Sequence, residues 1–104
     1  MRRNQLFLIR NISIGIAFVM LLASCAGIPA QEMYDARQAV LAAKNADAAM
    51  YAPDLFSEAE ELVRRAKLHM NERDYRQARD DAESARAKAM EARRISEAAA
   101  EQTR

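Results

Sequence analysis

The chain has one cysteine and one histidine, so few of its side chains can carry covalent or acid–base chemistry. Cys25 directly follows Leu22, Ala23 and Ser24, at the end of a long uncharged stretch. A single cysteine cannot form an intramolecular disulfide. Cys25 is therefore the one thiol of the sequence, and it has no cysteine partner within the chain.

The first 24 residues have the layout of a signal peptide. Met1–Asn11 is basic, with Arg2, Arg3 and Arg10, and Ile12–Ala23 is an uncharged run of 12 residues. A helix of that length is too short to cross a hydrocarbon core of about 30 Å, but it suits the apolar part of a signal peptide. The alternatives are an ordinary signal peptide with a cysteine after its cleavage site by coincidence, or an uncleaved anchor.

The segment Leu22-Ala23-Ser24-Cys25 resembles the lipobox of bacterial lipoproteins. The resemblance implies that the signal peptidase recognises Leu22, Ala23 and Ser24 and removes residues 1–24. Cys25 would then carry a diacylglycerol and an N-acyl chain such as palmitate. Ala26 is not a retention residue, which implies sorting to the periplasmic face of the outer membrane if the host is Gram-negative. Each buried CH₂ contributes about 0.8 kcal/mol, so the membrane becomes a partner through a firm anchor.

The charge balance beyond the leader is mildly acidic. The chain holds 16 Lys and Arg, three of them in the leader, so 13 face 15 Asp and Glu in the remainder. Without a basic excess, binding to nucleic acid is not expected. No glycine-rich loop and no metal-ligand spacing occurs in the sequence. We therefore expect no catalytic residue, no metal, no cofactor beyond the acyl chains on Cys25, and no small-molecule substrate.

His69 and the acidic residues near it are expected to be structural. His69 belongs to an apolar stripe near the end of a predicted helix, where a packed or capping histidine is far more common than a catalytic one. Glu60 with Arg64 and Glu61 with Arg65 have the i,i+4 spacing of ion pairs on a solvated helix face. Neither feature indicates an active site.

The chain beyond the tether is strongly helical in composition. Residues 31–104 contain 19 alanines and no glycine, which favours helix. Pro53 ends one helix and begins another, and Asp74 with Gln77 forms a predicted capping box. The pattern predicts three helices, at residues 31–50, 53–70 and 75–102.

These elements predict an all-α fold after a cleaved lipoprotein signal peptide. Short turns make consecutive helices antiparallel. The expected architecture is a three-helix up-down-up bundle or a helical hairpin with a long C-terminal helix. The domain organisation is then a signal peptide at 1–24, a lipidated tether at 25–30 and an alanine-rich helical domain at 31–104.

The predicted third helix carries a seam of mainly small residues at alternating spacings of three and four, namely Tyr75, Ala78, Ala82, Ala85, Ala89, Ala92, Ser96 and Ala99. Such a seam lets helices approach closely but buries little apolar area per residue. The bulk of the core is therefore expected from larger side chains: Val40, Leu55, Phe56, Leu62, Val63, Tyr75, and the methionines Met33, Met50, Met70 and Met90 as core filler.

Three short motifs suggest a relationship to known proteins: Glu32-Met33-x-x-Ala36-Arg37-x-Ala39-Val40, Tyr51-Ala52-Pro53-x-Leu55, and Asp74-Tyr75-x-x-Ala78-Arg79. Their combination resembles a widespread family of small alanine-rich helical domains of unknown function. Its members are largely Gram-negative lipoproteins or exported proteins, some fused to OmpA-like peptidoglycan-binding domains. The resemblance covers about residues 31–100 and implies no activity and no catalytic residue.

The expected function is a non-enzymatic role as a lipid-anchored envelope protein. Its helical domain would contact another envelope protein or a second copy of itself at the periplasmic face of the outer membrane. Two alternatives remain open. One is a self-associating coiled-coil lipoprotein, and the other is an adaptor for a cell-wall-remodelling enzyme.

Overall fold

The computed structural model describes residues 4–14 and 27–104. Residues 4–14 are helical and exposed. The body of the protein consists of four helices: α2 (Ala30–Asn45), α3 (Ala48–Tyr51), α4 (Pro53–Asn71) and α5 (Tyr75–Gln102). Every regular element in the described residues is a helix, which confirms the predicted all-α fold. Within these described ranges, no helix combines the length and the hydropathy needed to cross a membrane.

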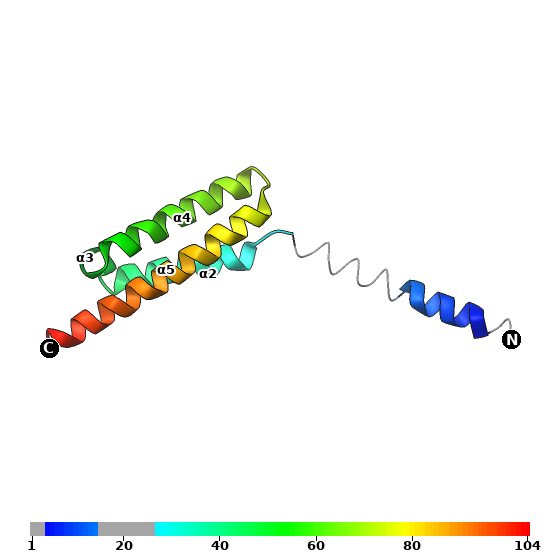
Figure 1. Cartoon of the computed structure of the whole chain (residues 1–104), viewed down its shortest axis with the longest axis horizontal. Helices are drawn as coiled ribbons and strands as arrows, with labels where there is room; N and C mark the ends of the chain where they lie inside the picture. Colours follow the sequence, from blue (N-terminus) through cyan, green and yellow to red (C-terminus); the bar gives the residue numbers. More distant parts are fainter. Residues whose placement is uncertain (1–3, 15–26) are drawn as a thin grey trace.

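The body is a bundle of three long helices in which α5 contacts both α2 and α4, as Figure 1 shows. Met33 and Ala36, early in α2, pack with Ala82 and Ala85, early in α5. These two helices therefore run parallel. Ala66, late in α4, belongs to the same cluster, so α4 runs antiparallel to both. The predicted up-down-up order of the helices is confirmed.

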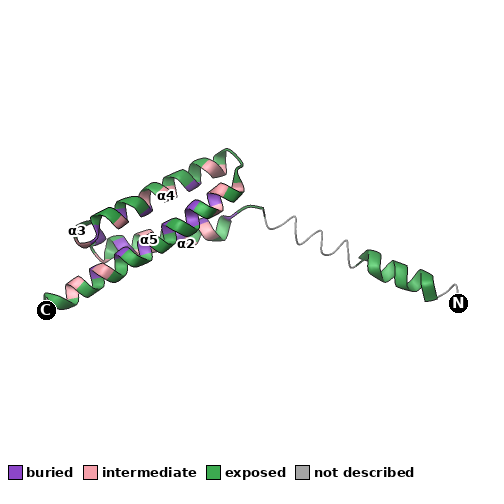
Figure 2. Ribbon diagram, viewed as in Figure 1, coloured by how far each residue is buried: buried purple, intermediate pink, exposed green. Residues whose placement is uncertain are grey.

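The interior is built from the alanine seam of α5. The seam residues from Ala78 to Ser96 are completely buried, whereas Tyr75 and Ala99, at the two ends of the predicted seam, are only partly buried. The Ser96 hydroxyl donates a hydrogen bond to the Ala92 carbonyl at 2.8 Å. One end of the bundle forms a cluster around Phe56, and the other forms a cluster around Met33. Figure 2 shows the buried residues in purple along the sides of the helices that face one another. Because alanine is short, the main chains of the helices can lie close together.

The helix boundaries follow the capping signals at two of three turns. The second helix begins at Pro53 and extends to Asn71, one residue beyond the predicted end. The third helix spans residues 75–102 as predicted. Proline at the first helical position loses no hydrogen bond, and Asp74 satisfies a free backbone N–H at the start of α5.

The first predicted helix, residues 31–50, is interrupted, and this prediction was wrong. The helix α2 ends at Asn45, and Asp47 adopts a left-handed conformation with φ of 60°. Aspartate accepts this conformation more readily than most residues. The break redirects the chain into α3, where Ala48 is completely buried in the cluster with Phe56. A helix continuing to residue 50 would leave two residues for the reversal before Pro53.

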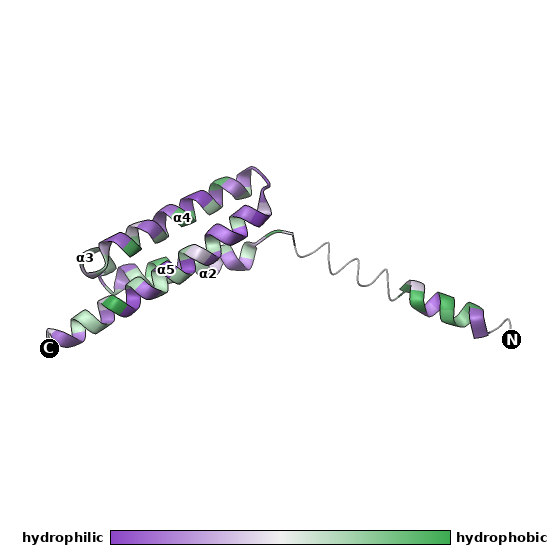
Figure 3. Ribbon diagram, viewed as in Figure 1, coloured by the Kyte–Doolittle hydropathy of each residue, from purple (hydrophilic) through white to green (hydrophobic). Residues whose placement is uncertain are grey.

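The methionines do not all fill the core. Met33 is 4% exposed, and Met70 packs against the same cluster. Met50 and Met90, however, are 73% and 53% exposed, which contradicts their predicted role as core filler. Met50 follows the break at Asp47 and so leaves the predicted apolar face. Figure 3 shows hydrophilic residues, in purple, along much of the ribbon of α4 and interspersed with hydrophobic ones along α5.

Candidate functional site

The predicted lipidation site lies outside the described residues. Leu22, Ala23, Ser24 and Cys25 belong to the undescribed stretch 15–26. The structure does describe where the body begins after them. Pro29 is completely buried, and its carbonyl accepts a hydrogen bond from the Met33 N–H at 3.0 Å. The packed body therefore starts four residues after Cys25.

The end of the body next to Pro29 also contains the turn between α4 and α5 (Figure 1). Glu32, in the first turn of α2, lies 3.4 Å from Arg79, in the second turn of α5. This ion pair fixes the start of α2 beside the start of α5. The opposite end of the body contains α3 and the last turns of α5.

The turn between α4 and α5 is closed by a regular C-capping motif. Arg73 has a φ of 61°, and the Asp74 N–H donates to the His69 carbonyl at 2.9 Å. The Arg73 N–H donates to the Met70 carbonyl at 3.1 Å, which completes the pattern that usually ends on glycine. Arginine occupies a left-handed position here, so the turn stores local backbone strain.

Asp74 begins α5 as predicted, but the capping box is only half formed. The Gln77 N–H donates to the Asp74 carboxylate at 3.3 Å. The Gln77 side chain does not return to the cap. Its amide instead donates to Asp81 Oδ1 at 3.2 Å, one turn further into the helix.

Asp81 is the one carboxylate that the helices bury within the described residues. Its side chain is 6% exposed, and three polar groups approach it. The guanidinium of Arg65 lies 3.6 Å from Oδ1, and Nε2 of His69 lies 3.5 Å from Oδ2. These two contacts come from α4, whereas Gln77 belongs to α5. We call Asp81, Arg65, His69 and Gln77 the Asp81 cluster.

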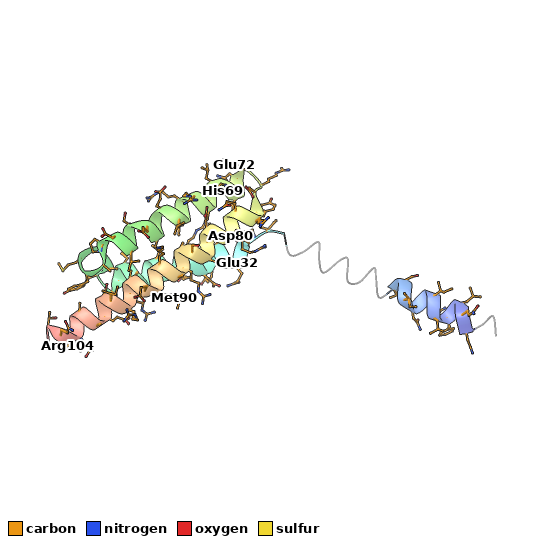
Figure 4. All side chains as sticks on the ribbon, in the orientation of Figure 1. Glu32, His69, Glu72, Asp80, Met90 and Arg104 are labelled. Atoms are coloured by element: carbon orange, nitrogen blue, oxygen red, sulfur yellow. The ribbon has the colours of Figure 1, made fainter. Side chains whose placement is uncertain are left out.

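The polar groups of the Asp81 cluster are incompletely satisfied. Asp81 Oδ2 and His69 Nδ1 are buried and have no hydrogen-bond partner within the described part of the chain. The nearest acid to His69 Nδ1 is Glu72 Oε2, at 3.6 Å on the same helix. Figure 4 shows His69 and Glu72 beside the turn at the end of α4. Burial of a carboxylate is costly without partners, so the cluster stabilises the hairpin only while α4 supplies them.

An aspartate–histidine pair can orient an imidazole. One imidazole nitrogen of His69 faces Asp81 and the other faces Glu72. The His69 side chain is 24% exposed and lies between these two acids at the end of α4.

The burial of Asp81 was not predicted from the sequence, and two predicted ion pairs are wrong. Arg64 pairs with Glu61 at 2.6 Å, not with Glu60, and Arg65 reaches Asp81 instead of Glu61. A signal for Asp81 existed in the sequence. It lies three residues after Ala78 and four before Ala85, which places an acid at the edge of the buried seam.

A second feature is a groove between α2 and α5. Two shallow hollows follow one another along these parallel helices, and Ala42 and Arg93 line both. The first hollow is also lined by Asp35, Gln38, Ala39, Arg86 and Met90. The second is also lined by Asn45, Ala46 and Glu97. We call these hollows together the α2–α5 groove. Its α2 wall combines three alanines with the polar residues Asp35, Gln38 and Asn45, and its α5 wall consists of long charged side chains and Met90.

No family model, curated protein or solved structure matches this chain. The resemblance of its three motifs to alanine-rich lipoprotein domains therefore stays a prediction. Three features of the chain itself bear on its function. These are the motif at Cys25, the Asp81 cluster and the α2–α5 groove.

Proposed function

We propose that this chain is a non-enzymatic lipoprotein whose helical body acts by contact at the periplasmic face of a Gram-negative outer membrane. The observation that carries the proposal is the spacing between Cys25 and the body. Leu22-Ala23-Ser24-Cys25 ends an uncharged run of signal-peptide length. The first buried residue of the body, Pro29, follows only four residues later. Such a layout suits a domain held directly against the membrane.

The short tether favours one orientation of the body. Four residues span at most about 14 Å when fully extended. An acylated Cys25 would keep the start of α2 close to the membrane, together with the turn between α4 and α5. The helix α5 has 28 residues and is about 42 Å long. Its last turns would then point into the periplasm.

The charge pairing on the surface of the helical body also favours a role in contacting another protein. Some charged side chains of α5 pair along the helix, as Arg93 does with Glu97 at 2.7 Å and Arg94 with Glu91 at 2.6 Å, and others pair with α2 and α4. The Asp81 cluster joins two helices of the body. The α2–α5 groove is left as the surface on which another helix can pack.

The proposal is tested by the fate of Cys25. Cells expressing the full chain are labelled with radioactive palmitate, and the protein is recovered from separated inner and outer membranes. The wild-type chain is expected to carry label and to fractionate with the outer membrane. Cys25→Ala removes the acceptor sulfur, so label is lost and the unprocessed precursor accumulates.

Ser24→Ala is the matched control, since it keeps a small residue in the motif and should retain both label and maturation. Label that persists in Cys25→Ala would overturn the proposal. A labelled wild-type protein found only in the inner membrane would overturn the assigned location.

A further inference from the structure

We propose that the α2–α5 groove binds a second copy of this chain. The two copies pack in parallel about a twofold axis that runs along the helices. In this dimer, α2 of each copy lies over α5 of the other. The inference rests on the proposed function for the orientation of the two copies. The partner is this chain itself, and the interface consists of four helices, two from each copy.

The shape of the groove suits a closely packed helix. Its α2 wall carries Ala39 and Ala42, and Ala46 follows directly after the end of α2; all three alanines are half-buried. Small side chains allow two helix backbones to approach. The opposite wall offers Met90, a flexible apolar side chain that is 53% exposed in the single chain. A second copy would place Met90 on the alanine wall of its partner and cover both.

The charges of the groove distinguish between the two possible twofold arrangements. Asp35 lies on the α2 wall, and Arg86 lies on the α5 wall of the same hollow. Arg86 is exposed. When the axis runs along the helices, the α2 wall of one copy faces the α5 wall of the other. Asp35 then meets Arg86 of the second copy at the same level, and the contact forms twice.

The antiparallel arrangement loses this pairing. An axis perpendicular to the helices would bring α5 against α5 and α2 against α2, so Asp35 of one copy would no longer lie opposite Arg86 of the other.

The tether also favours parallel packing. The body begins at Pro29, four residues after Cys25, so each acyl anchor stays near the start of its own α2. A parallel dimer brings both anchors to one end, where a single membrane can hold them. An antiparallel dimer places them at opposite ends of helices about 42 Å long, beyond the reach of two such tethers from an assembly standing on the membrane.

The arrangement is tested by cysteine cross-linking of the full chain in membranes. Two copies with different tags are co-expressed, one with Ala42→Cys and the other with Met90→Cys, and a short thiol cross-linker is added. The parallel dimer predicts a mixed product that contains both tags. Lys67→Cys, on the exposed side of α4, replaces either partner as the control and should give at least five-fold less product.

A cross-linked product between two Ala42→Cys copies or between two Met90→Cys copies, at the expense of the mixed product, would show antiparallel packing and overturn the arrangement. Mixed product no more abundant than with Lys67→Cys would overturn the dimer. Palmitate labelling of the same samples separates the two proposals. A labelled chain without the mixed product rejects the dimer alone, and an unlabelled chain rejects the lipoprotein assignment.

Charge exchange tests the pairing of Asp35 with Arg86 in the same assay. Asp35→Arg and Arg86→Asp should each lower the mixed product at least five-fold, because each brings like charges together. The double variant restores opposite charges across the interface and should recover most of the product. The pairing is wrong if the single variants cross-link normally or if the double variant fails to recover.

Discussion

Asp81 of α5 and His69 of α4 face each other across the hairpin, with His69 Nε2 3.5 Å from Asp81 Oδ2. The aspartate side chain is 6% exposed and the histidine side chain is 24% exposed. Arg65 approaches the same carboxylate from one turn earlier in α4. A buried carboxylate thus takes its partners from the neighbouring helix, which couples the position of α4 to that of α5.

A double-mutant cycle measures this coupling. His69→Leu removes the polar side chain that lies 3.5 Å from Asp81 Oδ2 and should lower the free energy of unfolding by about 0.5–1 kcal/mol. His69→Leu combined with Asp81→Leu removes both polar groups and should cost less than the sum of the single changes. Urea unfolding of the detergent-solubilised chain, followed by circular dichroism, gives these values. Glu72→Ala is the control, since that carboxylate is 57% exposed and its loss should cost under about 0.5 kcal/mol. Additive single changes would contradict the coupling.

The tight alanine seam predicts a sharp contrast between two alanines of α5. Ala85 is completely buried in the cluster with Met33, whereas Ala87 is exposed on the same helix. Ala85→Leu should destabilise the body by about 1–3 kcal/mol because close-packed helices must move apart. Ala87→Leu should change stability by less than about 0.5 kcal/mol. Thermal unfolding of the two variants provides the comparison. Equal melting temperatures would contradict the close packing of the helices around Ala85.

The strained turn predicts a stabilising substitution. Arg73 has a φ of 61°, a conformation that costs a residue with a side chain about 1–2 kcal/mol. Glycine adopts it freely but loses about 0.5–1 kcal/mol through greater freedom in the unfolded chain. Arg73→Gly should therefore stabilise the protein by about 0.5–1 kcal/mol, which raises the melting temperature by several degrees. Arg76→Gly, within α5, should instead lower it. A fall in both variants would rule out strain at Arg73.

The ion pair of Glu91 and Arg94 predicts a shifted titration. The hydrogen bonds from Arg94, at 2.6 and 3.0 Å, lower the pKa of Glu91 below its ordinary value of 4.5. Because the pKa is lower in the folded chain, the pair stabilises the fold above pH 4.5 and loses that effect as the pH falls through the folded pKa. The carboxyl resonance of Glu91, followed by NMR, should titrate below 4.5. Arg94→Met should bring its midpoint back up, whereas Arg93→Met should leave it unchanged.

The helix boundaries that could be predicted are those set by the chemistry of the residues at the boundary itself. Pro53 fixes φ and lacks an N–H, and Asp74 accepts a backbone hydrogen bond, so both mark a helix start without reference to distant residues. The break at Asp47 has no such local cause. It is placed by the burial of Ala48 in the cluster with Phe56, which is a tertiary effect. Neither proline nor glycine marks that position in the sequence.

The candidate sites also differ in whether local sequence or the fold reveals them. The motif at Cys25 is read from four consecutive residues, and its chemistry needs no fold. The Asp81 cluster depends on the angle at which α4 faces α5, since Arg65 has acids available on its own helix and still reaches across. The α2–α5 groove depends on α2 and α5 being parallel, which becomes visible only when Met33 and Ala36 are found beside Ala82 and Ala85.

An interior of alanine also limits how distinctive the sequence can be. Every seam position of α5 from Ala78 to Ser96 is completely buried, so only residues of about that size fit there. Alanine is also the best helix former and is common on helix surfaces. The residues under the strongest packing constraint therefore say the least about which fold the sequence adopts. Related chains with the same bundle would keep small residues at intervals of three and four. They would share few identical positions.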